Sequence, residues 1–410
     1  MDKRSFKNAL ILSAAQAVLG SQMPIYIILG GLVGQSLSEN ICFSTLPISL
    51  LIIGSMVSAP LLSKVMQDHG RRTGLIVGNI GGLIGSLFSL VAIYNQSFSF
   101  FMLGSFICGS YMSSQGFYRF AAADTCEQKF KARAISFVLT GGLVAAVLGP
   151  SIVKLSLTLS NPVPFFYPYM AIVFLNLLGP VLFMFLDIPK TEEPESSVKN
   201  LDIVNNETSN RTLFQMLGNP IIGISILCAM ITYGLMNLVM TATPMAIVGC
   251  GFTPGDAASV VSAHALAMYL PSFFTGRLIE KIGEKKVILS GMLLLTLSVI
   301  IALISNSLSN FYVSLILVGL GWNFGFIGAT SLLTKNHSSL EKGKIQGLND
   351  FCIFGFVAIA SLTSGFLMNC SSSSNDLGWQ LINLTATPFI GLAILSVSFL
   401  SIFNRRFKTQ

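Results

Sequence analysis

Long apolar segments recur along the whole chain, and they are the feature that most restricts its fold. Charged residues make up 10% of the 410 residues, whereas soluble domains carry about 25%. A membrane-spanning helix needs about 20 mostly apolar residues. The sequence therefore predicts an all-α membrane protein with twelve transmembrane helices, near residues 8–34, 41–66, 73–95, 97–119, 133–157, 164–187, 219–247, 255–279, 286–307, 309–334, 346–369 and 380–403.

The longest polar segment lies between the sixth and seventh apolar segments. It reads IPKTEEPESSVKNLDIVNNETSNRT and is rich in Glu, Asn, Ser and Thr. It has no apolar periodicity, which is typical of a linker. We therefore expect an N-terminal six-helix bundle over 1–187, a cytoplasmic linker over 188–218 and a C-terminal six-helix bundle over 219–410.

The basic residues predict the orientation in the membrane. With both termini in the cytoplasm, every one of the 24 Lys and Arg residues except Lys154 falls on the cytoplasmic side, as the positive-inside rule requires. No cleavable signal peptide is evident, so the first helix would serve as a signal anchor. The net charge of +7 follows from the same bias and does not indicate a nucleic-acid partner.

Two basic loops echo each other at an offset of 213 residues, which aligns Gly70 with Gly283. The first, SKVMQDHGRRTGL, follows the second apolar segment, and the other, GRLIEKIGEKKVI, follows the eighth. Both resemble the G-x-L-x-D-R-x-G-R-R loop of the major facilitator superfamily, although the first copy has Gln67 where the acid belongs. The resemblance implies two pseudo-symmetric bundles with substrate held between them. It also implies a gating role for Gly70, Arg71, Arg72, Gly276, Arg277, Glu280, Lys281 and Gly283.

Sulfur and imidazole are the notable polar groups within the apolar segments, where such groups are functional candidates. Met236 and Met240 are four residues apart and therefore share one helix face, as do His264 and Met268 on the next segment. The rise of a helix places both pairs at a similar depth. Thioether and imidazole ligands suit Cu(I). The pattern predicts a four-ligand cage for a soft metal ion, and packing or an organic-solute pocket remains the alternative.

Pro271 interrupts the eighth segment. It lacks the amide hydrogen that would bond the carbonyl oxygen of Ala267. We therefore expect the helix to be loosened between His264 and Met268, where alternating access would require bending.

The paired M-x-x-x-M and H-x-x-x-M motifs resemble those of CcoA-type bacterial copper importers. The stretches YRFAAAD (118–124), RAISFVLTGG (133–142) and HALAMYLPSFFTGRLIEKIG (264–283) are similar to that family as well. The resemblance implies copper import across the bacterial inner membrane, with Met236, Met240, His264 and Met268 as metal ligands, and a supply of copper for cytochrome oxidase assembly. Copper would be the substrate, and no cofactor would be bound permanently. We further expect a monomer that exchanges copper with periplasmic and cytoplasmic chaperones.

The seven cysteines are scattered and predict no disulfide framework. The resemblance implicates Cys228 and Cys250, which we expect to pass the ion through the cage by thiolate exchange. Cys42, near the outer end of the second segment, is an alternative partner for Cys250 in a disulfide.

Two other functions stay open. One is a major facilitator transporter of a small organic solute or drug, with Gln16, Gln22, Tyr111, Trp322 and Asn323 as candidate contacts. The other is a copper-binding sensor or assembly factor without flux. An enzyme is not expected, because the sequence shows no nucleophile-and-base constellation and no phosphate-binding loop.

Overall fold

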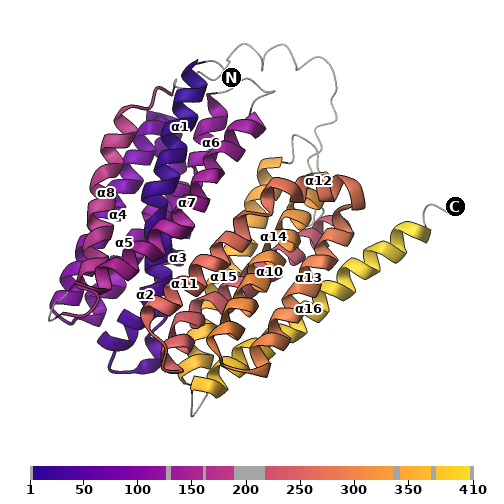
Figure 1. Cartoon of the computed structure of the whole chain (residues 1–410). Helices are drawn as coiled ribbons and strands as arrows, with labels where there is room; N and C mark the ends of the chain where they lie inside the picture. The colour runs from indigo at the N-terminus through magenta and orange to yellow at the C-terminus, as the bar shows by residue number, and fades with distance from the viewer. Residues whose placement is uncertain are drawn as a thin grey trace.

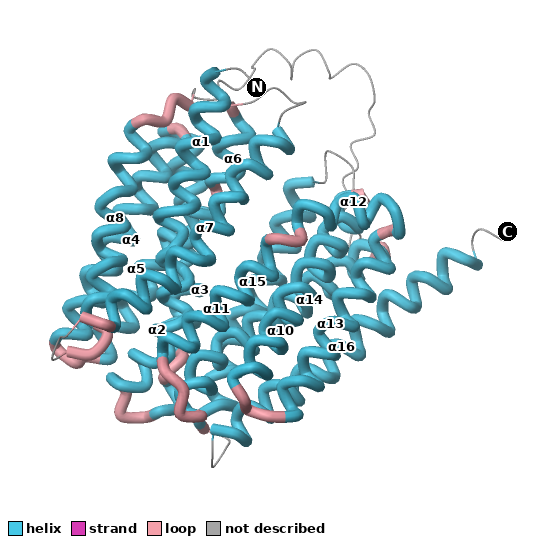
Figure 2. Tube along the Cα trace, in the orientation of Figure 1, coloured by secondary structure: helices cyan, strands magenta, loops and turns pink. Residues whose placement is uncertain are grey.

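Helices alone make up the secondary structure in the parts of the chain that the computed structural model describes, which are residues 3–125, 131–159, 163–188, 218–335, 342–370 and 375–406. They form two bundles that lie side by side (Figure 1, Figure 2). The N-terminal bundle contains α1 (Lys3–Val18), η1 (Leu19–Ser21), α2 (Gln22–Leu37), η2 (Ile41–Phe43), α3 (Leu46–His69), α4 (Arg71–Tyr94), α5 (Phe98–Gly116), α6 (Tyr118–Asp124), α7 (Lys131–Leu157) and α8 (Phe166–Met184). The C-terminal bundle contains α10 (Pro220–Gly249), α11 (Pro254–Tyr269), α12 (Ser272–Ile282), α13 (Glu284–Ile304), α14 (Leu308–Thr334), α15 (Lys342–Asn369) and α16 (Asn375–Arg406).

The predicted twelve-span architecture is confirmed. Ten segments of the described chain are long and apolar enough to cross a membrane, and the bent pair α11 and α12 adds an eleventh. The remaining predicted span is α5, which packs against α3 and α4. The protein is therefore a multi-pass membrane protein. Most of the predicted linker lies outside the described residues, so the boundaries of the three predicted parts stay a prediction.

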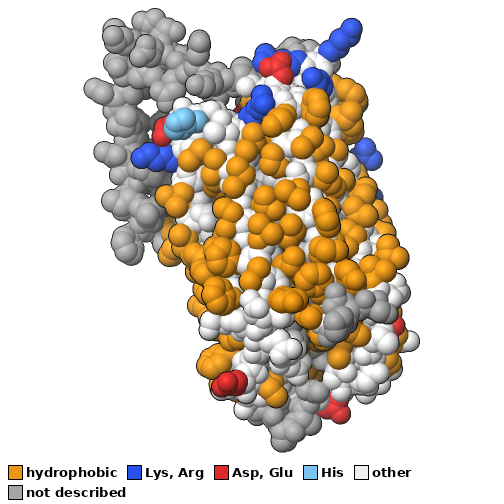
Figure 3. Space-filling view, turned by 90° about the vertical axis from the view of Figure 1, so that its left-hand side faces the viewer, with side chains coloured by type: hydrophobic (Ala, Val, Ile, Leu, Met, Phe, Trp, Pro, Cys, Tyr) orange, Lys and Arg blue, Asp and Glu red, His pale blue; other side chains and the backbone are white. Residues whose placement is uncertain are grey.

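Lys and Arg residues gather at one end of the molecule, above a broad apolar band (Figure 3). We call this the basic end; it carries the start of α1, the α3–α4 turn and the α12–α13 turn. The opposite end carries the turns 38–45 and 250–253. Large apolar side chains are exposed on the flanks, among them Leu61, Phe174 and Leu395, and a lipid environment would cover such side chains.

The two bundles contact each other away from the basic end. Helix α7 packs on α11, α3 on α15, and α2 on both α10 and α11. Ser262 donates a hydrogen bond to the carbonyl oxygen of Ala146 (2.8 Å), and Ser49 donates to Ser361 (2.9 Å). Toward the basic end the bundles diverge (Figure 1). The molecule is therefore closed at the opposite end and splayed at the basic end.

A disulfide joins the two bundles at the opposite end. It links Cys42 in η2 to Cys370, directly after α15, with a Cα–Cα distance of 5.1 Å. Beside it, the Asn369 amide donates to the Ser44 hydroxyl (2.8 Å). The expected alternative, a bridge between Cys42 and Cys250, is wrong, because the end of α15 places Cys370 against η2 and leaves Cys250 as a free thiol.

The two related basic loops share one backbone geometry. Gly70 joins α3 to α4 with φ 91°, and Gly283 joins α12 to α13 with φ 85°. Glycine adopts positive φ without a steric penalty, whereas other residues rarely do so. This match supports the predicted equivalence of the loops.

Each loop anchors an ion pair to the helix end beside it. In the N-terminal bundle, Arg71 pairs with Asp124 of α6 (2.7 Å), which replaces the acid that is missing from the first loop. The offset of 213 residues aligns Arg71 with Glu284, and Glu284 pairs with Lys335 after α14. Both halves therefore have an ion pair at the equivalent position. The loop supplies the positive charge in the N-terminal half and the negative charge in the C-terminal half. The other predicted loop residues lie on exposed surface: Arg72, Gly276, Arg277, Glu280 and Lys281.

We expect reversal of one charge in this pair to weaken the N-terminal bundle slightly. The Arg71→Asp change should cost about 1 kcal/mol or less, because the two side chains remain partly exposed. Adding Asp124→Arg should restore the melting temperature of the detergent-solubilised protein. Arg72→Asp, at the exposed neighbouring position, is the control. If the loss of melting temperature in the double variant equals the sum of the losses in the two single variants, the two side chains do not form a direct pair.

Candidate functional site

The four predicted metal ligands lie in the core of the C-terminal bundle. Met236 and Met240 are on α10, and His264 and Met268 are on α11. All four side chains are buried, and the three methionines belong to one apolar cluster. Helices α10 and α11 contact each other, as the predicted cage requires.

His264 is oriented by a third helix. Its Nδ1 lies 2.7 Å from the carbonyl oxygen of Leu315 on α14. Because a carbonyl can only accept, Nδ1 carries the proton and Nε2 keeps its lone pair. Nε2 is buried without a hydrogen-bond partner among the described residues. The imidazole therefore has a lone pair that can coordinate a metal or accept a hydrogen bond from a polar solute, while the four-ligand cage stays a prediction.

The bend in the eighth span lies elsewhere than predicted. Helix α11 continues through His264 and Met268 to Tyr269. The axis then turns by 42° before α12 begins at Ser272. The expectation of a loosened segment between His264 and Met268 is wrong: the amide of Leu270 still donates to the carbonyl oxygen of Leu266 (2.9 Å), so the helix stays regular up to the proline.

The two auxiliary cysteines lie at opposite parts of α10, and the expected thiolate relay stays a prediction. Cys228 is buried in α10. Cys250 follows α10 and is half-buried, with its Sγ 3.6 Å from Oδ1 of Asp376. Burial, together with the Asp376 carboxylate, raises the pKa of Cys250 to about 11. Cys250 is therefore a neutral thiol at physiological pH, and the thiolate is the form that binds metals.

Two of the candidate solute contacts belong to the interior of the N-terminal bundle. Gln22 is fully buried, donates to the carbonyl oxygen of Leu19 (3.0 Å) and accepts from Asn176 (2.9 Å). Asn79 donates to the same Asn176 side chain (3.1 Å). Tyr111 is also fully buried. This network ties α2, α4 and α8 together, so its first role is structural.

Gln16 lies in a different environment, near the kink between α1 and α2. Gln16 is half-buried. The space beside Gly20 brings it near Gln115: a Cβ atom built on Gly20 would lie 3.5 Å from Nε2 of Gln16 and 2.8 Å from Nε2 of Gln115. The two amides from α1 and α5 therefore approach the same point. Gln16 could be predicted as a candidate contact from the sequence, whereas Gln115 was not predicted.

Five aromatic side chains from four helices of the C-terminal bundle form a cluster that we call the aromatic wall. Trp322 and Phe326 of α14 stack with centroids 5.2 Å apart and an interplanar angle of 11°. Tyr233 of α10 stands edge-on to both, at 5.5 and 5.3 Å. Tyr269 of α11 contacts Trp322 (6.3 Å), and Phe354 of α15 contacts Tyr233 (6.3 Å).

The aromatic wall is partly accessible: Trp322 is buried, whereas the other four rings are half-buried. Between Ile231 and Ile247, Tyr233 is the one residue of α10 that is not buried, although α10 is surrounded by α2, α11, α14, α15 and α16. Arg119 of α6, in the other bundle, lies close enough for its charge to be felt at the hydroxyls of Tyr233 and Tyr269. The wall therefore lies on the side of the C-terminal bundle that is directed toward α6, where the two bundles diverge.

Trp322 is the one candidate solute contact from the sequence that lies in this wall, and its Nε1 is buried without a described partner. The other four aromatic residues and Arg119 were not predicted from the sequence. The spacing of Trp322 and Phe326, four residues apart on one helix face, was an available signal.

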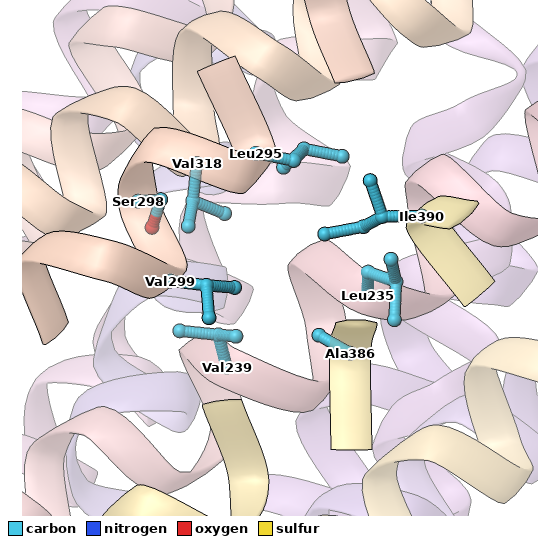
Figure 4. Close-up of a pocket in the computed structure, with 8 residues that line it drawn as sticks. All are labelled: Leu235, Val239, Leu295, Ser298, Val299, Val318, Ala386 and Ile390. Atoms are coloured by element: carbon cyan, nitrogen blue, oxygen red, sulfur yellow. The ribbon is translucent and has the colours of Figure 1, made fainter. Parts of the chain in front are cut away.

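A cavity in the same bundle is too small to hold a solute. Its volume is about 10 Å³, which is room for one water molecule at most. Figure 4 shows the side chains that line it between α10, α13, α14 and α16. They are Leu235, Val239, Leu295, Ser298, Val299, Val318, Ala386 and Ile390.

Known relatives of the chain are transporters. The riboflavin transporter RfnT of Brucella anthropi is 39% identical over 390 residues, which cover 95% of this chain and 94% of that protein. The uncharacterized MFS-type transporter YddS of Bacillus subtilis is 30% identical, over 89% of this chain and 86% of that protein.

Solved structures show the same fold. A variant of the nucleoside transporter NupG superposes with a TM-score of 0.73 at 16% identity, covering 95% of this chain and 99% of that one. A bacterial homolog of the human lysosomal transporter Spinster, in an inward-facing conformation, gives 0.69 at 13% identity and covers 97% of both chains. The sequence profile of the Major Facilitator Superfamily matches residues 9–246 and 222–409. The chain belongs to the major facilitator superfamily.

Proposed function

We propose that this protein transports a small, planar aromatic solute of the riboflavin type, with the aromatic wall as its binding surface. The wall is the observation that carries the proposal. Its five rings converge from four helices and face the other bundle, where a transporter of this superfamily holds its substrate. The 39% identity with a riboflavin transporter supports the same class of solute.

The chemistry of the surface fits such a solute. The isoalloxazine ring of riboflavin is large, flat and uncharged near neutral pH, and aromatic side chains stack on rings of this kind with about 1–3 kcal/mol each. The polyol chain and the ring carbonyls need hydrogen-bond donors. Gln16, Gln115 and Arg119 of the N-terminal bundle are donors of this kind, and Trp322 adds an N–H on the wall itself that has no partner in the described part of the chain.

The orientation follows from the same arrangement. We place the basic end in the cytoplasm of a bacterial cell, with both termini inside, because Lys and Arg are retained on that side of a membrane. The divergent bundles would then open the aromatic wall toward the cytoplasm, while the contacts at the opposite end close the route to the outside. Alternating access would close the cytoplasmic side and open the route to the outside.

Copper import is the less supported function. The resemblance to CcoA-type importers predicts it, and the free Nε2 of His264 is compatible with it. A relative that matches 95% of the chain, however, is a riboflavin transporter, which favours the organic-solute alternative. The non-transporting sensor has no relative among the proteins compared above.

Fluorescence titration tests the proposed site. Stacking on tryptophan quenches flavin emission, and the chain has 2 tryptophans, of which Trp379 packs on Phe311 outside the wall. We expect purified protein to quench riboflavin fluorescence saturably, Trp322→Phe to quench less, and the matched control Trp379→Phe to quench as the wild type does. Absence of saturable quenching, or equal loss in both variants, would contradict the proposed site.

A further inference from the structure

The break in the eighth span exposes backbone groups that need partners. Pro271 interrupts the helical hydrogen-bond ladder, and the axis bends by 42° between α11 and α12. A carbonyl that loses its helical partner within a membrane costs several kcal/mol unless another group satisfies it. The bend therefore requires a neighbouring helix to supply hydrogen bonds.

Asn323 of α14 supplies them, and its side chain is fully buried. Its Nδ2 donates to the carbonyl oxygen of Met268, before the bend (2.6 Å), and to the hydroxyl of Ser272, after it (2.8 Å). Its Oδ1 lies 2.6 Å from the hydroxyl of Thr275, which is also 2.8 Å from the carbonyl oxygen of Pro271. One amide therefore joins both pieces of the bent span to α14.

The residues on either side of these contacts belong to the aromatic wall. Asn323 follows Trp322, and Met268 precedes Tyr269. Trp322 and Tyr269 form a ring contact (6.3 Å). Their direct neighbours in the sequence, Asn323 and Met268, form a hydrogen bond between the same two helices.

From this geometry we propose that Asn323 is a positioning residue of the substrate site. By holding both sides of the bend, it fixes where Tyr269 stands against Trp322. It also connects the wall to α12, the segment of the gating loop that leads to Gly283. The proposal rests on the proposed function where it concerns the solute, but the positioning of Trp322 and Tyr269 can be measured without any solute.

Three variants separate this role from general stability. Asn323→Leu removes every hydrogen bond from the α14 side. Thr275→Val removes one contact from the α12 side and leaves α14 unchanged. Asn383→Leu is the matched control, because Asn383 is also fully buried in the C-terminal bundle but donates to Trp379 within its own helix (2.9 Å).

The solute-free measurement is acrylamide quenching of tryptophan emission in a Trp379→Phe background, where Trp322 is the remaining tryptophan. We expect Asn323→Leu to increase the quenching constant about two-fold, Thr275→Val to increase it less, and Asn383→Leu to leave it unchanged, since contacts distant from a residue act independently of it. An unchanged constant in both Asn323→Leu and Thr275→Val would overturn the proposal.

The transport measurement uses riboflavin in proteoliposomes. Misplacing Tyr269 should raise the KM of Asn323→Leu about ten-fold, which corresponds to the loss of one stacking contact, with a smaller change in Vmax. A lower Vmax at unchanged KM would indicate less folded protein and would overturn the positioning role. If Trp322 quenching changes as expected while the wild type moves no riboflavin, the proposed function fails and the positioning role stands.

Discussion

Transport by the oxidised protein is expected to be near zero, and transport by the Cys42→Ser variant is expected to be insensitive to oxidation. The reason is the position of the disulfide: Cys42 and Cys370 belong to different bundles and meet at the end where those bundles touch. Alternating access requires that end to open. The disulfide is a covalent bond across that end and would hold the two bundles together. The hydrogen bond between Asn369 and Ser44, two residues after Cys42, joins the bundles at the same place.

The measurement is solute flux in proteoliposomes before and after a membrane-impermeant phosphine reductant. We expect the reductant to activate the wild type strongly and to leave Cys42→Ser and Cys370→Ser unchanged. Cys250→Ser is the control, because Cys250 is a free thiol at the same end, and it should respond as the wild type does. Full activity of the wild type under oxidising conditions, with the disulfide verified by mass spectrometry, would show that the bond does not lock the bundles.

Removal of two rings from the aromatic wall is expected to have the second-largest effect. The double variant Tyr233→Ala with Trp322→Ala loses an edge-to-face pair (5.5 Å) and two surfaces for stacking. At about 1–3 kcal/mol for each ring, the apparent affinity for riboflavin should fall by about 30-fold or more. Saturation curves of initial uptake rates would measure this change.

A stacked pair on the outer flank provides the control for that variant. Phe88 and Phe100 stack at 6.4 Å, and half of Phe100 is exposed. Phe100→Ala should leave the affinity unchanged, because it removes a ring away from the wall. An affinity of the double variant within about two-fold of the wild type would exclude the wall as the binding surface.

Much of the fold could be predicted because its causes are local in the sequence. Hydrocarbon requires about 20 apolar residues for a span, so the helices could be placed from composition alone. The equivalence of Gly70 and Gly283 followed from a short repeated motif, and both residues have positive φ in the structure.

The candidate site could be predicted less well because it depends on contacts between distant segments. Cys370 approaches Cys42 across 328 residues, and no spacing rule connects them. The four wall residues other than Trp322 come from α10, α11, α14 and α15, so their convergence is a property of helix packing. The Met and His pattern, in contrast, was visible in the sequence, but shared spacing on two helices does not determine whether the side chains bind an ion or fill the core.

The acidic residue expected in the first loop is a second case in which the sequence did not predict a contact between distant segments. The motif places that acid at position 67, where this chain has Gln67. The structure satisfies Arg71 with Asp124 from α6 instead, more than fifty residues away in the sequence. A motif therefore predicts the charge that must be satisfied more reliably than the residue that satisfies it.

Substrate flux in proteoliposomes tests the central claim most directly. Purified, reduced protein would be reconstituted and supplied in parallel with labelled riboflavin and with Cu(I), using the wild type, Trp322→Ala and His264→Ala. We predict saturable riboflavin flux that Trp322→Ala weakens, and no copper flux above that of empty liposomes. Copper flux that His264→Ala abolishes, without riboflavin flux in any sample, would contradict the proposed function and restore the metal cage.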